Sequence, residues 1–219
     1  MASVEKIKNV CDFFVITHKL QNTLRAGWVT CGVPAERIQS VAEHIYSAQM
    51  LALVINSEFE LGLNISKIAL MLAIHELGEC IIGDLPAYGC PCTREEKRRM
   101  EDEAVEKILS GLSSPQEIKK LYKEYEERKT GEARFCYLID KLECCFQAKY
   151  HEDMGHLEWE KLKPNEAQKE RIAKRRDQGY KRFSDFWIDA DIERHFMDDE
   201  IFKTIAEFVL KNDGVFKDN

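Results

Sequence analysis

The stretch MLAIHELGECIIGDLP, residues 71–86, points both to a fold class and to a chemistry. Its first half has the apolar residues of a buried helix face. His75 and Glu76 nevertheless stand side by side within it, and Glu79 follows one helical turn after His75. A buried carboxylate costs several kcal/mol unless it finds a partner. The stretch therefore predicts a helix that carries a polar site on its buried side.

The composition of the whole chain is that of a folded protein. With 219 residues, 44% of them hydrophobic, the chain suits one sizeable domain. Its net charge of -7 argues against non-specific nucleic-acid binding. The basic run at 169–182 is accordingly interpreted as one solvated helix face. The chain has no apolar run of the roughly 18 residues that span a bilayer, so no membrane association is expected.

The eight cysteines are expected to be reduced thiols in the cytoplasm, because residues 1–14 mix charges with apolar residues and lack a secretory apolar core. Cys90 and Cys92 form a C-x-C pair, which raises the alternative of a zinc site. A structural zinc site usually takes two such pairs, and no second pair of that kind follows. Loop cysteines are therefore the preferred interpretation.

Helical periodicity recurs along the chain and strand-like alternation is nearly absent, which predicts an all-α fold. Ser66 is expected to cap the helix that contains the opening stretch, and Ser114-Pro115-Gln116-Glu117 is expected to form a capping box. The expected helices span approximately residues 4–14, 34–57, 66–80, 100–112, 115–125, 132–151 and 199–208.

Three of these expected helices turn ionisable groups toward their apolar sides. On helix geometry, His44 shares a face with Val41 and Ala48, and Asp140 shares one with Cys136. With the opening stretch, the inward-facing groups are His44, His75, Glu76, Glu79 and Asp140. A divalent cation would stabilise all of them at once, and two imidazoles with carboxylates suit Mn, Co, Fe, Zn or Mg. The alternative is that each is a hydrogen-bonded polar residue of the core.

Three segments carry a resemblance to a known family: SVAEHIYSAQMLAL, IALMLAIHELGECIIGDLPAY and YLIDKLECCFQAKYHE. They resemble the HD-domain metal-dependent phosphohydrolases, and the GDLP and DKLE blocks are closest to the 5'-deoxynucleotidase branch. The resemblance implies a single HD domain over 1–219, a helical bundle with its core at about 25–152 and a C-terminal helical extension at 153–219. It also suggests a homodimer.

The resemblance assigns roles to individual residues. The implied metal ligands are His44, His75, Glu76 and Asp140. Glu79 takes the position of the catalytic carboxylate, and Asp84 that of the aspartate near the substrate. In the upstream segment LRAGWVTCGV, Arg25 would hold the phosphate and Trp28 would line the pocket.

One position departs from the family pattern. The family has His-Asp where this chain has His75-Glu76. Glutamate is one methylene longer and still binds metals at about 2.0–2.2 Å, so metal binding is expected to persist. The expected activity is that of a metal-dependent phosphoric monoester hydrolase of the 5'-nucleotidase type, acting on deoxyribonucleoside 5'-monophosphates.

Two other functions remain open on the sequence. The chain could be an HD phosphohydrolase with another nucleotide substrate, or a non-catalytic protein that binds metal or nucleotide and has lost activity with His-Asp. Glu79 and Asp84 argue against the second, because a binding protein has no chemical need for them.

Overall fold

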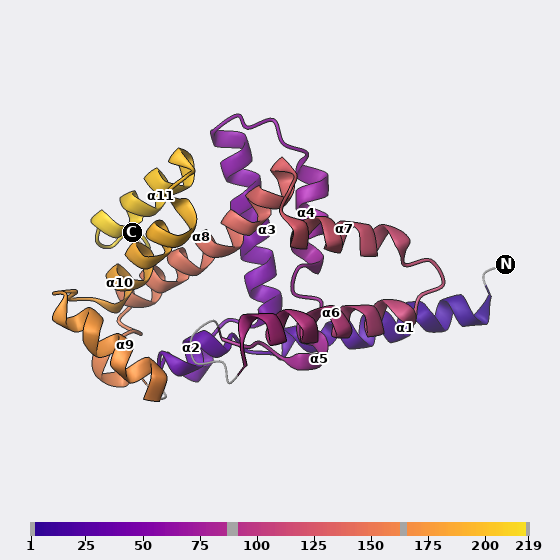
Figure 1. Ribbon diagram of the computed structural model, residues 1–219, viewed down its shortest axis with the longest axis horizontal. Coiled ribbons are helices and arrows are strands. Elements are labelled where there is room, and N and C mark those ends of the chain that lie inside the picture. The colour runs from indigo at the N-terminus through magenta and orange to yellow at the C-terminus, as the bar shows by residue number, and fades with distance from the viewer. Residues whose placement is uncertain (1–2, 87–91, 163–165, 218–219) are drawn as a thin grey trace. The chain divides into compact units, whose positions relative to one another are not determined.

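The computed structural model describes residues 3–86, 92–162 and 166–217, and within them the fold is all-α, as the sequence predicts (Figure 1). These ranges contain no strand, only an isolated bridge between Leu24 and Ser40. The helices are α1 (Val4–Thr17), α2 (Ala26–Thr30), α3 (Val41–Glu58), α4 (Ile65–Ile74), α5 (Glu79–Ile82), α6 (Arg94–Ser110), α7 (Gln116–Glu127), α8 (Gly131–Asp153), α9 (Glu166–Asp177), α10 (Phe183–Asp191) and α11 (Glu200–Lys211).

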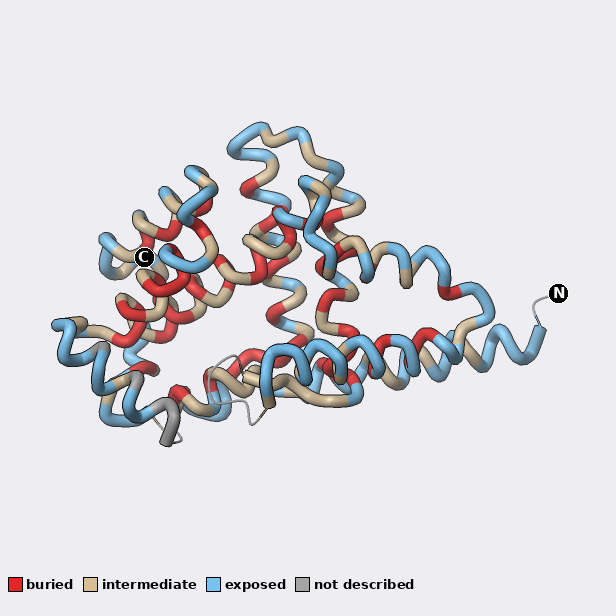
Figure 2. The backbone as a smooth tube through the Cα atoms, viewed as in Figure 1, coloured by how far each residue is buried: buried red, intermediate tan, exposed pale blue. Residues whose placement is uncertain are grey.

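The first of two compact units comprises the described residues within Met1–Arg25, Gln39–Leu85 and Cys90–Tyr137. Helices α3 and α4 pair along their lengths, and α5 packs against α6. Their apolar faces form one core, whose buried members are Leu20, Val41, Leu77, Cys80, Val105, Ile108, Leu109 and Tyr122. Helix α1 has no buried residue of its own (Figure 2).

The second unit comprises the described residues within Ala26–Ile38, Pro86–Gly89 and Leu138–Asn219. Its core is rich in aromatic side chains, with Trp28 stacked on Trp187 at 5.2 Å between ring centroids. The other buried members are Cys31, Val33, Ile38, Ala148, Leu157, Phe183, Phe186 and Ala190. The single-domain organisation with a C-terminal extension stays a prediction.

Polar residues that precede the helices explain where several of them begin. Ser40 and Glu43 form a capping box at the start of α3, and Thr93 and Glu96 form one at α6. Asp199 caps α11, its carboxylate accepting from the Phe202 amide. These caps satisfy amides that a helix leaves without intrahelical partners.

Three predicted helix starts are wrong. Pro34 precedes a short 3-10 turn, and α3 begins only after Ser40. Asn64, not Ser66, caps α4, because its side chain accepts from the Lys67 amide. Pro115 is the residue before α7 and no capping box forms there.

The end of α4 differs more consequentially from the prediction. The predicted helix ran on to residue 80, whereas α4 ends at Ile74 and α5 starts at Glu79. Between them the backbone makes i to i+3 hydrogen bonds, from Leu77 to Ile74 and from Glu79 to Glu76. His75 and Glu76 therefore lie on a tight turn rather than inside a helix.

Within the described residues, no helix combines the length and apolar character that crossing a bilayer requires.

Asp191, at the end of α10, couples the stability of the fold to pH. It is 7% exposed, and burial raises its pKa from 3.8 to about 6, although the Cys145 thiol donates to its carboxylate. The unfolded chain ionises this group above pH 4, whereas the folded protein keeps it protonated up to about pH 6. Stability is therefore highest below the unfolded pKa and declines as pH rises through about 6.

We expect Asp191→Asn to remove this dependence. Asparagine cannot ionise, so the variant should gain about 3 kcal/mol relative to the wild type between pH 4 and pH 7. Urea unfolding of both proteins at several pH values measures the difference. If the difference in free energy of unfolding between the two proteins does not change with pH, the raised pKa of Asp191 is contradicted.

Candidate metal centre

Two buried imidazoles lie next to each other in the first unit. His44, on α3, is fully buried, and the centroid of its ring lies 5.5 Å from that of His75. It reaches the interior because its helical neighbours Val41 and Ala48 are also fully buried. The predicted inward placement of His44 on its helix is confirmed.

The tautomer of His75 is set by a backbone carbonyl. Its Nδ1 lies 2.7 Å from the oxygen of Leu72 and donates to it. The proton is thus on Nδ1, and Nε2 presents its lone pair, which is the form in which histidine binds a metal. On the other side of the imidazole, the ring of Tyr125 makes an edge contact at 5.4 Å and fixes its orientation.

Glu76 brings a carboxylate to both imidazoles. Its Oε1 lies 3.5 Å from His75 Nε2 and 3.9 Å from His44 Nε2. The longer arm of glutamate allows this reach from the turn that follows α4. The donor atoms of the three residues all lie within 4.8 Å of one another.

This donor set fits a divalent cation. Two donors that each bind one ion at about 2.0–2.2 Å lie at most about 4.4 Å apart, and both Glu76 separations are below that limit. Imidazole nitrogen with carboxylate oxygen is the ligand chemistry of Zn, Mn, Fe or Co. The alternative of separate, unrelated core histidines does not account for this convergence.

Arg25 and Asp84 lie beside the same carboxylate. Arg25 Nη1 donates to Glu76 Oε1 at 3.3 Å and lies 3.6 Å from Asp84 Oδ1. The guanidinium therefore contacts two carboxylates of one segment, residues 76–84, which is far from Arg25 in sequence. Its planar set of donors has the geometry that matches an anionic oxygen pair.

Glu79 is a buried carboxyl next to this group. It is 2% exposed, and among the described residues its Oε2 accepts no hydrogen bond. Burial, together with the charges of Glu76 and Asp84, raises its pKa well above the usual range, although Arg25 and Lys97 oppose the shift. A raised pKa favours the protonated form of the carboxyl and suits it to exchange a proton with a neighbouring group.

Two predicted site residues belong to the second unit. Asp140 is buried on α8, and Trp28 is 2% exposed and packs edge-on against His151 as well as on Trp187. Their roles in a common site with His44, His75 and Glu76 stay predictions. Cys90, of the C-x-C pair, lies outside the described residues, and the described cysteines are free thiols.

Lys97 and Glu101 approach the site from α6, and neither was among the site residues predicted from the sequence. Lys97 Nζ donates to the carbonyl oxygen of Leu85 at 2.9 Å and lies 3.3 Å from Glu101 Oε1. A signal for them was present: 97, 101, 104 and 108 follow helical spacing, and Ala104 and Ile108 are core residues.

Comparison with known proteins places the chain among relatives of known family. A family model described as the HD domain matches residues 17–182. Human 5'-deoxynucleotidase HDDC2 is 33% identical over 154 residues, which cover 68% of this chain and 71% of the human protein. The 5'-deoxynucleotidase HDDC2 of Dictyostelium discoideum is 34% identical over 164 residues, covering 72% and 85%.

The fold has counterparts among solved structures. A conserved hypothetical protein from Pyrococcus furiosus aligns with a TM-score of 0.65 at 26% identity, over 91% of this chain and 98% of that one. The range matched by the family model contains every site residue predicted from the sequence.

Gly78 gives a structural test of how α6 meets the site. A Cβ on Gly78 would lie 3.1 Å from the carbonyl oxygen and 3.2 Å from the Cα of Glu101, both backbone atoms. We expect Gly78→Ala to lower the free energy of unfolding by about 1–3 kcal/mol, because α6 must move away. Urea unfolding measures the loss.

Gly27→Ala is the matched control. Gly27 lies in the short helix α2, and nothing comes within 4 Å of a Cβ placed there. That variant should gain up to about 1 kcal/mol from the helix preference of alanine. Equal effects in the two variants would show that α6 does not contact Gly78 closely.

Proposed function

The chain belongs to the HD-domain family, and from that premise we propose that it is a metal-dependent phosphohydrolase that releases phosphate from deoxyribonucleoside 5'-monophosphates. The observation that carries the proposal is the convergence of His44, His75 and Glu76 within coordination distance, with Arg25 beside them. The relatives named 5'-deoxynucleotidase support the substrate class.

We propose Asp140 as the fourth ligand. Helix α8 is unbroken from Gly131 to Asp153, and Cys136, one turn before Asp140, lies 3.8 Å from the Ile68 carbonyl of α4 and 4.0 Å from the sulfur of Met71. Asp140 follows Cys136 by one turn of the same helix. Mn, Co, Mg, Fe and Zn are all compatible with two imidazoles and two carboxylates.

The side chains of this site have complementary tasks. A bound divalent cation would lower the pKa of a water and withdraw charge from a phosphoryl oxygen. Arg25 provides a planar fork of donors that matches two phosphate oxygens. Glu79, which can hold a proton in its buried position, exchanges it with the water or with the leaving oxygen of the nucleoside. Asp84 orients Arg25 or the sugar, and Trp28 lines the nucleoside pocket.

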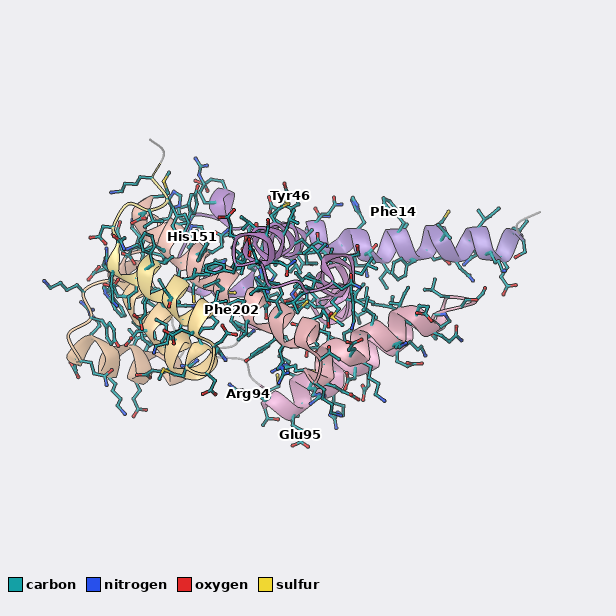
Figure 3. The ribbon with its side chains drawn as sticks, turned by 90° about the horizontal axis from the view of Figure 1, so that it is seen from above. Phe14, Tyr46, Arg94, Glu95, His151 and Phe202 are labelled. Atoms are coloured by element: carbon teal, nitrogen blue, oxygen red, sulfur yellow. The ribbon has the colours of Figure 1, made fainter. Side chains whose placement is uncertain are left out.

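We also propose that the enzyme acts in the cytoplasm and as a homodimer, with no nucleic-acid partner. Free thiols at the described cysteines fit a reducing compartment. Apolar side chains exposed on α1 and α3 support self-association: Val4, Ile7, Val10, Phe14, Tyr46, Met50 and Leu53. Phe14 and Tyr46 lie along the same edge of the view in Figure 3. The net charge of -7 makes a nucleic-acid partner unfavourable.

The experiment that tests the function combines metal analysis with a substrate panel. Purified protein is analysed for bound metal, and phosphate release is measured from deoxy- and ribonucleoside monophosphates with added Mn, Co or Mg. The proposal predicts one metal per chain and release from the deoxy substrates. Bound metal without turnover of any nucleotide would instead favour a binding protein. Turnover of other nucleotides only would mean that the substrate belongs to a different class.

Glu79→Ala separates catalysis from metal binding. We expect the variant to keep its metal and to lose activity by about 10²–10⁴-fold, because a proton-transferring group is removed. Glu103→Ala, on the exposed side of α6, is the control and should match the wild type. Loss of the metal from Glu79→Ala would show that Glu79 is itself a ligand.

Glu76→Asp restores the family's His-Asp pair. We expect metal binding to persist and activity to be preserved or raised, because aspartate also provides an anionic oxygen. Glu76→Gln, which lacks the charge, should bind metal more weakly. A metal-free, inactive Glu76→Asp would mean that this site needs the longer side chain.

A further inference from the structure

The first turns of α6 bring a half-buried ion pair next to the segment that carries Asp84. The side chains of Lys97 and Glu101 are 29% and 24% exposed, and their charged groups lie 3.3 Å apart. Ion pairs on an open helix surface contribute little. This one lies on the face of α6 that continues into the core through Val105 and Ile108, so its position is fixed by packing.

The same lysine contacts the loop that carries Asp84. Lys97 Nζ donates to the carbonyl of Leu85, the residue after Asp84, at 2.9 Å. The loop begins at Gly83, whose φ of +75° is a conformation that side chains rarely adopt. With a glycine at its start, the Asp84 segment has much backbone freedom to lose. Lys97 ties it to a packed helix.

The segment held by the Lys97 hydrogen bond also contacts the residues of the site. Asp84 Oδ1 lies 3.6 Å from Arg25 Nη1, which donates to Glu76 Oε1. Lys97 thus acts on Arg25 through Asp84. Burial lowers the pKa of the Lys97 ammonium, but Glu101 and the site carboxylates outweigh burial and raise it, so the group stays charged at neutral pH.

Helix α6, which carries Lys97, is itself held in place by packing and by its N-terminal cap. Gly78, next to Glu79, lets the Glu101 backbone approach within van der Waals contact. Val105, Ile108 and Leu109 are buried in the core with Leu77. The helix start is fixed by the capping box of Thr93 and Glu96.

We propose that Lys97 is a positioning residue of the phosphohydrolase reaction: its ammonium holds the Leu85 carbonyl and thereby fixes Asp84 against Arg25. The proposal rests on the proposed function for its effect on turnover. The tie itself does not, because it is a property of the folded chain. The position matters for rate because a displacement of about 1 Å can cost about 100-fold.

The test uses Lys97→Met, which keeps the length of the side chain and removes its donors. Arg99→Met is the matched control, since the Arg99 side chain is 70% exposed and pairs with Glu103. Lys97→Arg keeps a donor and a charge and is the rescue variant. We expect Lys97→Met to lower kcat/KM by about 10–100-fold, Lys97→Arg to recover most of it, and Arg99→Met to match the wild type.

Two further readouts distinguish positioning from a general structural role. If Lys97 acts through Asp84, Lys97→Met should cost less than about 3-fold in an Asp84→Asn background, because coupled residues are not additive. Hydrogen exchange at the amides of Ile81, Ile82 and Gly83, which bond to Gly78 and Glu79 carbonyls, should be faster in Lys97→Met only.

Losses that multiply in the double variant, or unchanged exchange in Lys97→Met, would overturn the proposal. In a wild-type chain that hydrolyses no monophosphate, the proposed function fails, and the exchange measurement alone then decides whether Lys97 holds the Asp84 segment. An equal drop in melting temperature without faster local exchange would mean that Lys97 stabilises the fold as a whole.

Discussion

The whole site depends on one carboxylate oxygen of Glu76, a side chain that is 14% exposed. Glu76 Oε1 lies within 3.9 Å of both imidazole Nε2 atoms and 3.3 Å from the Arg25 guanidinium. A carboxylate in such a place costs several kcal/mol unless cations surround it. In the chain by itself Arg25 supplies that charge. A divalent ion between the imidazoles would supply it as well, and Arg25 could then turn its donors to a phosphate.

Local backbone geometry makes this arrangement available. Because α4 ends at Ile74, His75 and Glu76 lie on a turn with i to i+3 hydrogen bonds, where successive side chains are placed differently from those of an α-helix. The carbonyl of Leu72, in the last turn of α4, fixes the His75 tautomer. Gly78 then allows α6 to close over the turn. Each of these features depends on a residue that the sequence shows, but no single residue predicts the arrangement without the others.

Much of the site followed from helical periodicity. His44 has apolar neighbours at helical spacing, and its burial is as predicted. The end of α4 could not be predicted, because a lone glycine inside an apolar pattern is compatible with a continuing helix. Lys97 was missed because its charged neighbours at 94–103 mask a face that becomes apolar only from Ala104 onward. Asp140 and Trp28 depend on the second unit, and their part in the site stays a prediction.

The central claim is that a cation binds between His44, His75 and Glu76. An anomalous difference map from crystals of zinc-loaded protein tests it most directly. The account predicts one strong peak within about 2.0–2.2 Å of both imidazole Nε2 atoms and a Glu76 oxygen. The claim would be contradicted if the zinc peak lay elsewhere and these three side chains contacted only one another and Arg25.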